Sequence, residues 1–136
     1  MRTYFIFKIK KHYATLTKNK PYQVYKAIED MYYLNQKDLL SPENIFLQMH
    51  DKFNTEILNN KIYNTYKDTY TYTKYQNTHK INDYFKDEET KLIINQSYLV
   101  IKTTKQIPTF FEILSKNNNL FICDFLNKDY FWLSNI

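Results

Sequence analysis

Few side chains in this sequence have the types and the spacing that catalysis or metal binding requires. The three histidines, His12, His50 and His79, lie on separate segments, and no two of them have the spacing of a metal-ligand pair. Zinc sites are built from closely spaced cysteine and histidine ligands. Because the sequence has a single cysteine, Cys123, we expect neither a metal site nor any other cofactor.

Cys123 and two groups of charged residues are the remaining candidates for catalysis. Cys123 lies in an apolar run beside Asp124, and a neighbouring carboxylate opposes formation of the reactive thiolate. We therefore expect a buried, structural thiol. The pair His50–Asp51 and the acidic run 87–89 could form acid–base pairs, but solvated loop charges explain them better. The sequence predicts a protein that is not an enzyme.

The absence of glycine excludes several kinds of site. Phosphate-binding loops, dinucleotide fingerprints and nucleophile elbows need glycine for positive φ or for close backbone approach. The sequence contains none, so these motifs are excluded in their standard forms. Turns must instead use asparagine and aspartate, which tolerate the left-handed region better than other residues.

The charge balance leaves two interpretations open. The net charge is +5, and one arginine stands among 19 basic residues. Such a charge attracts nucleic acid or an acidic partner, but a bias toward residues with A/T-rich codons supplies lysine without selection for a ligand. The stretch TYTYTKYQNTHK (69–80) interleaves aromatic residues with positive charge, as single-strand nucleic-acid binders do. We favour the compositional origin, and do not expect direct nucleic-acid binding.

Residue periodicity predicts the elements that position a site. A 136-residue chain is expected to form one domain. No apolar run is long enough for a signal peptide or a membrane span, so we expect a cytosolic protein that does not contact the membrane. Residues 3–9 read as a central strand with both faces apolar. A short helix or loop is expected next, then a helix from Pro21 and a second amphipathic helix over 42–53.

The second half of the sequence favours strands. The alternation of Tyr and Thr in 66–75 predicts a strand, and 82–91 reads as a polar turn region. Residues 91–103 predict a hairpin turning at Asn95. A helix follows over 108–116, ended by three asparagines, and then a closing hairpin with its turn at 127–129. This order predicts an α+β domain with a mainly antiparallel sheet and about three helices.

Both ends of the chain resemble the sporulation inhibitor of replication (SirA) family. The C-terminal match is FFEIL (110–114) followed by CDFLNKDYFWLSN (123–135), which resembles the family pattern D-F-x-x-K-x-Y-x-W-L. Phe131 stands where the family usually has glycine. At the N-terminus, RTYFIFKIKKHYA (2–14) resembles the family's aromatic-rich strand and the lysine-containing segment that follows it. These stretches cover about a third of the chain.

The resemblance implies a function without catalysis. Members of that family are small cytosolic proteins that bind the N-terminal domain of the replication initiator DnaA and hold back initiation of chromosome replication. The expected alternative, of a different class, is a basic, Tyr-rich module that binds single-stranded nucleic acid. Binding to phosphates weakens steeply when salt is added. The salt dependence of binding therefore distinguishes the DnaA-binding function from the nucleic-acid-binding function.

The resemblance also implies a partner-binding surface. In the family the contact involves the segment after the first strand and the second main helix. Carried over by position, this implies Tyr13 and Thr17 in the first segment, and Asn44 and Leu47 on the helix beginning at Pro42. Thr17 stands where the family has an aromatic, so one expected anchor is missing. The C-terminal motif is expected to belong to the fold.

Overall fold

The computed structural model describes residues 1–33 and 48–135. Its described helices are α1 Lys11–Thr17, α2 Pro21–Tyr33, α4 Thr55–Tyr66, α5 Phe110–Leu114 and the 3₁₀ helix η1 Leu133–Asn135. Its described strands are β1 Arg2–Ile9, β2 His50–Asp51, β3 Tyr72–Tyr75, β4 Thr78–Asp83, β5 Glu88–Ile94, β6 Leu99–Thr103, β7 Leu120–Asp124 and β8 Asp129–Trp132.

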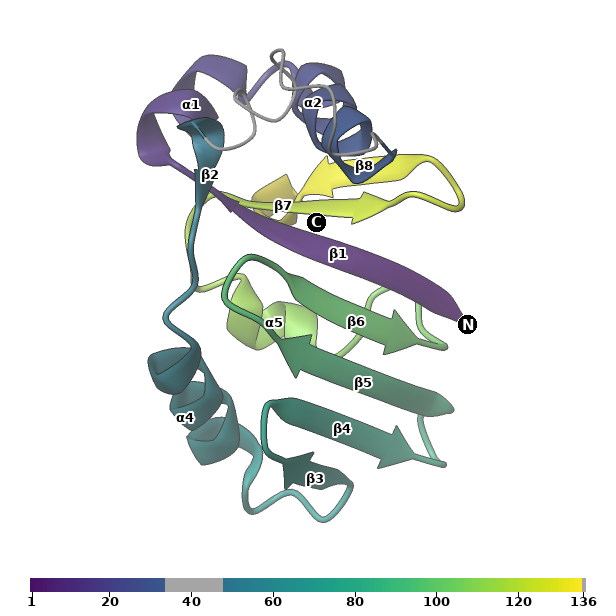
Figure 1. The fold of residues 1–136 in the computed structure, drawn as a ribbon. Helices are drawn as coiled ribbons and strands as arrows, with labels where there is room; N and C mark the ends of the chain where they lie inside the picture. The colour runs from purple at the N-terminus through teal and green to yellow at the C-terminus, as the bar shows by residue number, and fades with distance from the viewer. Residues whose placement is uncertain (34–47, 136) are drawn as a thin grey trace.

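All of these strands join one antiparallel sheet (Figure 1). The order is β3-β4-β5-β6-β1-β7-β8, and β2 pairs with the end of β1. β1 lies at the centre, between β6 and β7. This arrangement confirms the predicted α+β fold, the central first strand and the two predicted hairpins, β5–β6 and β7–β8.

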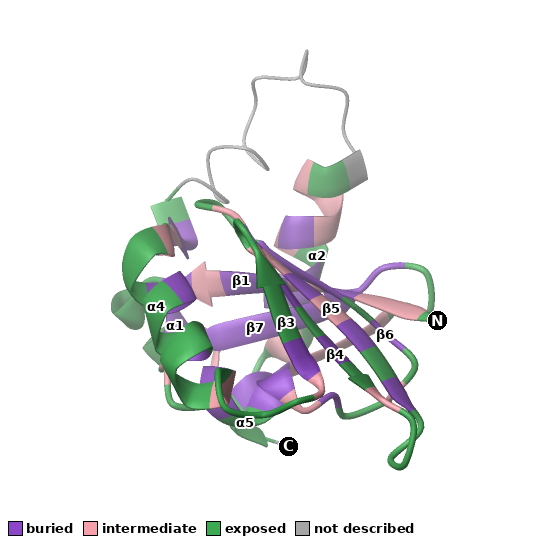
Figure 2. Ribbon diagram, turned by 90° about the horizontal axis from the view of Figure 1, so that it is seen from below, coloured by how far each residue is buried: buried purple, intermediate pink, exposed green. Residues whose placement is uncertain are grey.

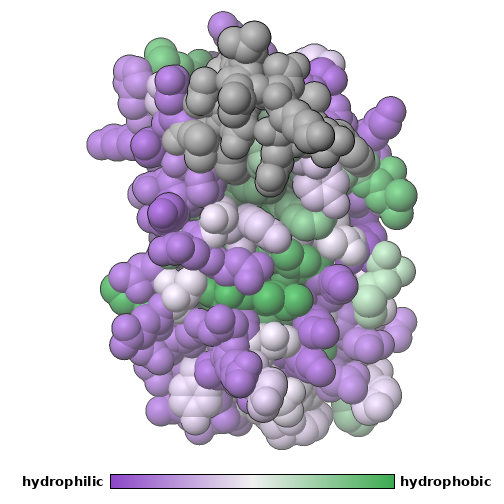
Figure 3. Space-filling view, viewed as in Figure 1, coloured by the Kyte–Doolittle hydropathy of each residue, from purple (hydrophilic) through white to green (hydrophobic). Residues whose placement is uncertain are grey.

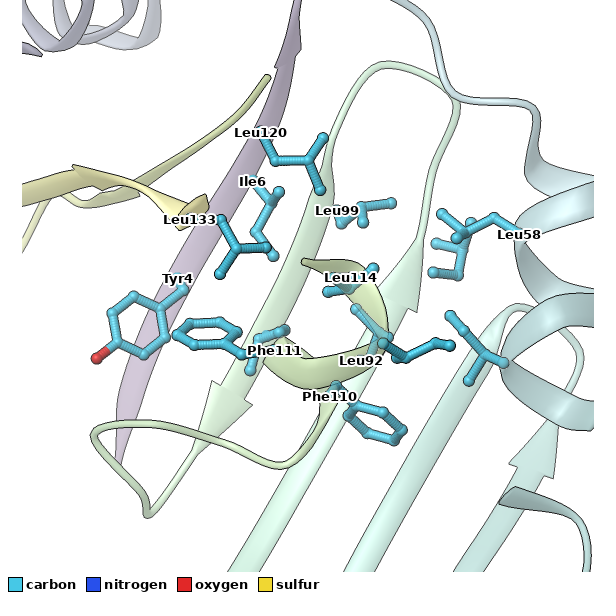
Figure 4. Packing of buried hydrophobic residues seen from close by; sticks show 14 of the residues in the cluster. Tyr4, Ile6, Leu58, Leu92, Leu99, Phe110, Phe111, Leu114, Leu120 and Leu133 are labelled. Carbon is cyan, nitrogen blue, oxygen red and sulfur yellow. The ribbon is translucent and has the colours of Figure 1, made fainter. Parts of the chain in front are cut away.

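One face of the sheet is covered by α4 and α5 (Figure 2). In β1, Tyr4 and Ile6 point to this face and pack with Phe111 and Leu114 of α5 (Figure 4). On α4, the buried Leu58 and Ile62 and the partly buried Tyr66 recur at four-residue intervals, which is the spacing of one helix face. This core spans the sheet from β3 to β7.

The opposite face is covered over only part of its width. Phe7 and Ile9 of β1 pack with β7, β8 and the buried stripe Val24, Tyr25 and Ile28 of α2. In Figure 2, α2 lies above the β1 and β7 side of the sheet, and no described helix covers this face over β3 to β6. Since residues 1–33 and 48–135 leave that half open, it is an accessible surface of the described structure.

The tight turns use residues other than glycine in the left-handed region. Positive φ angles occur at Gln76, Asp87, Asn119 and Lys128, at 51°, 52°, 65° and 53°. Asn119 is the last of the three asparagines expected to end a helix over 108–116. The helix α5 is shorter, Phe110–Leu114, with Ser115 as its C-cap, so the left-handed asparagine lies in the connection to β7. Gln76 and Lys128 differ from the expectation, because neither is among the residue types that favour this region.

The predicted strand over 66–75 is wrong in its first half. Tyr66 is the last residue of α4, and the strand β3 begins only at Tyr72. α4 is capped by Asn54, whose side chain accepts a hydrogen bond from the Ile57 backbone N–H at 3.1 Å. Packing of this helix against the sheet overrides the local preference of Tyr and Thr for a strand.

The predicted helix over 42–53 is wrong at its C-terminal end. His50 and Asp51 form β2 and pair with Ile9 and Lys8 of β1. The buried Met49 and Phe53 belong to the cores on opposite faces of the sheet. The chain therefore passes from one face of the sheet to the other through β2, and one helical stripe cannot hold both residues. The start of this helix, at Ser41–Glu43, lies outside the described residues.

The predicted turn region 82–91 is also too long. β4 extends to Asp83, and β5 begins at Glu88, so the connection is 84–87. The side chain of Asp83 accepts hydrogen bonds from the backbone N–H groups of Phe85 and Lys86, at 3.0 and 3.2 Å. A carboxylate that bonds to nearby backbone N–H groups stabilises a short turn, which lets the polar residues on both sides pair as strands.

Candidate functional site

The three histidines are separated in the structure. His12 is exposed on α1, His50 Nε2 lies 2.5 Å from the carbonyl oxygen of Ser97, and His79 is fully buried between β4 and α4. In residues 1–33 and 48–135, no group of three His, Cys, Asp or Glu side chains could hold a metal ion.

Cys123 has the environment of a structural thiol. It is fully buried in the core under α1 and α2. Burial is the main cause that raises its pKa well above the ordinary value, and Glu29 on α2 adds to the effect. The opposing carboxylate is thus Glu29, rather than the neighbouring Asp124 that the sequence suggested. A thiol held in its protonated form is a poor nucleophile.

The acidic run 87–89 is only partly solvated, which corrects the expectation of loop charges. Glu88 is buried. Its carboxylate accepts hydrogen bonds from Thr90 Oγ1 at 2.6 Å and from Thr109 N and Oγ1 at 3.1 and 2.5 Å. Glu88 therefore ties β5 to the start of α5, and this role is structural.

The other candidate acid–base pair, His50 and Asp51, forms the strand β2 and is not in a loop either.

The C-terminal motif is also occupied in holding the fold together. Asp124 is buried and accepts hydrogen bonds from Asn127 N and Nδ2, at 3.2 and 2.7 Å, which closes the β7–β8 turn. Arg2 Nη2 lies 3.1 Å from the same carboxylate. Phe125 and Trp132 are buried in the core. As predicted, this motif is part of the fold.

The helix α1 is the first of the two segments that the resemblance implies for partner binding. Ala14 anchors the helix in the core, and the opposite face exposes Lys11, His12, Thr15 and Leu16. These four side chains line a shallow hollow of about 470 Å³. Leu16 is 61% exposed, so this face combines an apolar group with positive charge. Such a combination suits a protein interface with a polar rim.

Tyr13 and Thr17 lie one helical turn apart on α1, at the border between its buried and exposed faces. The Tyr13 hydroxyl donates to Gln48 Oε1 at 3.5 Å, and its ring meets the His12 ring edge-on, with centroids 5.5 Å apart. Thr17 Oγ1 donates to the Tyr13 carbonyl oxygen at 2.6 Å. The structure thus brings these two predicted residues together.

Asn44 and Leu47, the other two predicted residues, lie outside the described residues. Gln48, the next residue along the chain, contacts Tyr13, and Met49 O accepts a hydrogen bond from Lys10 N at 2.7 Å. Leu16 and Gln48 were missed by the sequence analysis. The signal for Leu16 was its position as an apolar residue three after Tyr13 in a polar helix.

The Tyr/Thr-rich segment does not form the surface that the nucleic-acid alternative required. Tyr66 is partly buried against the core at the end of α4, and Tyr72 is buried against His79. Tyr70 and Tyr75 are exposed, but Tyr70 precedes the strand and Tyr75 ends it. The alternating tyrosines therefore do not line one face of a strand.

A comparison with protein-family models assigns nearly the whole chain to one family. A family model described as sporulation inhibitor of replication protein SirA matches residues 2–136. In a search of curated proteins, none matched the chain. Within the described residues, no helix is both long and apolar enough to cross a bilayer.

Proposed function

The chain belongs to the SirA family of sporulation inhibitors of replication, and from this premise we propose that it binds the N-terminal domain of the initiator DnaA. In this proposal the protein is a non-enzymatic, cytoplasmic regulator. By covering a DnaA surface used for self-assembly or helicase loading, it holds back initiation of chromosome replication.

The α1 surface is the observation that carries the proposal. Tyr13 is half-buried, and its hydroxyl and ring are both held by neighbours, Gln48 and His12. An aromatic side chain that is already ordered loses little entropy on binding, which raises the affinity it contributes. The exposed Leu16 lies on the next turn of the same helix and extends the apolar contact.

The positive charges on α1 supply the rim of this surface. Lys10 and Lys11 are exposed at its N-terminal end, and Lys20 is exposed beyond its C-terminal end. Charges at the rim of an interface change the association rate and its salt dependence more than the final affinity. Binding that is centred on Tyr13 and Leu16 should therefore weaken only modestly with added salt.

Thr17 is the departure from the family pattern, and it has a consequence for affinity. Its hydroxyl is bonded to the carbonyl oxygen of Tyr13, so the side chain covers its own helix. An aromatic at this position would extend outward from the border of the surface, next to Tyr13. We therefore expect a Thr17→Phe variant to bind the partner about tenfold more tightly, because a buried Phe contributes about 1.5–3 kcal/mol.

Calorimetric titration with the isolated N-terminal domain of DnaA from the same organism tests the proposal. Tyr13→Ala should weaken binding by about 30-fold, the size of an interface hot spot of about 2 kcal/mol. Leu16→Asp places a charge in the centre of the surface and should have a similar effect. Tyr63→Ala, which removes an exposed tyrosine from α4, is the matched control and should bind like the wild type.

The outcomes separate the partner from the site. Saturable binding that Tyr13→Ala and Leu16→Asp leave unchanged would keep DnaA as the partner and reject α1 as the contact. No binding by the wild-type protein at high concentration would reject DnaA. Circular dichroism of each variant shows whether a loss of binding comes from a loss of fold.

A further inference from the structure

The open half of the sheet carries a row of lysines. Lys80 of β4 lies directly opposite Lys91 of β5, and Lys91 lies directly opposite Lys102 of β6. Residues paired in this way point to the same face, and their Cβ atoms are about 4.5–5.5 Å apart. Threonines continue the row at both ends, Thr73 on β3 and Thr3 on β1.

These lysines point away from the core. Along β5 the burial alternates, with Thr90 and Leu92 buried on the side of α4 and α5 and Lys91 on the other side. Figure 3 looks onto this open face, where a small hydrophobic area lies among hydrophilic side chains. The neighbouring row includes Ile93 and Val100, which are directly paired.

Among the described residues, no ion pair balances the positive charge of the row. Within residues 1–33 and 48–135, the carboxylates of the ion pairs are bound by Arg2 and Lys26, and none of the three lysines is among the bases. The one acidic residue on their face of β5 is Glu89, two positions from Lys91. Like charges directly opposite each other destabilise a sheet, so repulsion among these three lysines lowers the stability of the sheet.

Protection of a sheet edge does not explain this arrangement. Lysines on edge strands prevent unwanted pairing with other chains, but β4, β5 and β6 are all interior strands, and the edge on this side is β3. A bound polyanion does explain it, because an anion lying along the row relieves the repulsion among the three ammonium groups.

We propose that this face, formed by Lys80, Lys91, Lys102 and Tyr75, binds single-stranded nucleic acid through its phosphate backbone. Tyr75 is 74% exposed and lies opposite Thr78, on the same face as Lys80. An exposed aromatic ring beside a row of positive charges offers a base a surface for stacking while the lysines contact phosphates. The surface is distinct from α1, so the inference goes beyond the proposed function and does not rest on it. It revises the expectation from the sequence that the protein does not bind nucleic acid directly, because the lysine row is formed by pairing of β4, β5 and β6 and not by the alternating tyrosines.

Fluorescence anisotropy with a labelled dT₁₂ oligonucleotide tests the proposal on the full chain. If three phosphates are neutralised, the logarithm of the binding constant should fall with a slope of about −2 against the logarithm of salt concentration, or about 20-fold weaker binding at 200 mM than at 50 mM salt. Tyr75→Ala should weaken binding about tenfold, through loss of stacking.

Two triple variants of equal net charge provide the decisive comparison. Replacing Lys80, Lys91 and Lys102 by glutamine should weaken binding at least 30-fold and flatten the salt dependence. Replacing Lys52, Lys61 and Lys116, which are exposed elsewhere, should change binding less than threefold. Equal losses in the two variants would show attraction by net charge alone and overturn the proposal.

Two further results bear on the identity of the occupant. Competition by polyglutamate as effective as that by dT₁₂ would overturn the nucleic-acid assignment in favour of an acidic protein. The absence of saturable binding to dT₁₂ at 50 mM salt would overturn the proposal itself. The first triple variant should retain wild-type affinity for the DnaA domain, since α1 is unchanged. The two measurements therefore test separate proposals: nucleic-acid binding by the lysine row, and DnaA binding by α1.

Discussion

Acidification should destabilise the fold through His79, which lies in a buried network between β3, β4 and α4. The Tyr72 hydroxyl lies 2.6 Å from His79 Nδ1, and Asn59 Oδ1 lies 2.7 Å from His79 Nε2. Asn59 Nδ2 donates to Asn77 Oδ1 at 3.1 Å, which turns its Oδ1 toward the ring. These contacts assign the neutral ring with its proton on Nε2 and Nδ1 accepting from Tyr72.

The size of the effect follows from the pKa of His79. Burial, with a smaller contribution from the charge of Lys74, lowers this pKa from 6.5 to about 4. Between these pH values the unfolded chain binds more protons than the folded protein, so stability falls as the pH is lowered. At about 1.4 kcal/mol for each pKa unit, the full effect is about 3 kcal/mol. About 2 kcal/mol of it is lost between pH 7 and pH 4.5.

Urea unfolding of the wild type and of His79→Gln, at a series of pH values from 7 to 4.5, measures this contribution. Carboxylates titrate in both proteins, so the comparison between them isolates His79. The wild type should lose about 2 kcal/mol more than the variant, and its His79 ring signals in NMR should not titrate until the pH is near 4. Parallel stability curves, or a ring that titrates near pH 6.5, would refute the reasoning.

Two substitutions and one labelling experiment also test the fold. Glu88→Gln keeps the shape but removes the charge that Thr109 N and Oγ1 bond to, and should lower the free energy of unfolding in urea by about 2 kcal/mol. Lys128→Gly should raise it by about 0.5 kcal/mol, because φ is 53° there and glycine avoids the left-handed penalty; an unchanged or lower value would contradict this. Cys123 should react with a thiol reagent only in denaturant, since burial and, secondarily, Glu29 raise its pKa; rapid labelling of the folded protein would show that the thiol is accessible.

Elements with a strong local pattern were predictable from the sequence. The strand β1 has apolar residues on both faces, and the hairpins β5–β6 and β7–β8 each have two apolar runs around a polar turn. Pro21 correctly marked the start of α2. In these segments local preference and tertiary packing agree, which is the condition under which sequence patterns are reliable.

The predictions failed where distant parts of the chain decide the local structure. Met49 and Phe53 have helical spacing, but β1 offers a pairing partner to the residues between them, and the chain changes faces of the sheet. Tyr66 opens the alternation of Tyr and Thr that predicted a strand, but it is the last residue of α4 and packs against a core formed by distant parts of the chain. Neither partner strand nor core is visible in a short window of sequence.

The candidate surfaces divide in the same way. Position in the family pattern alone pointed to Tyr13 and Thr17, and α1 then places them one turn apart. The sequence by itself also determined the fold class, the absence of glycine-dependent motifs and the buried cysteine. Only the tertiary structure brought Gln48 to Tyr13, and placed Lys80, Lys91 and Lys102 side by side. Strand register decides which residues of separate hairpins become neighbours, and register is set by packing of the whole sheet against its helices.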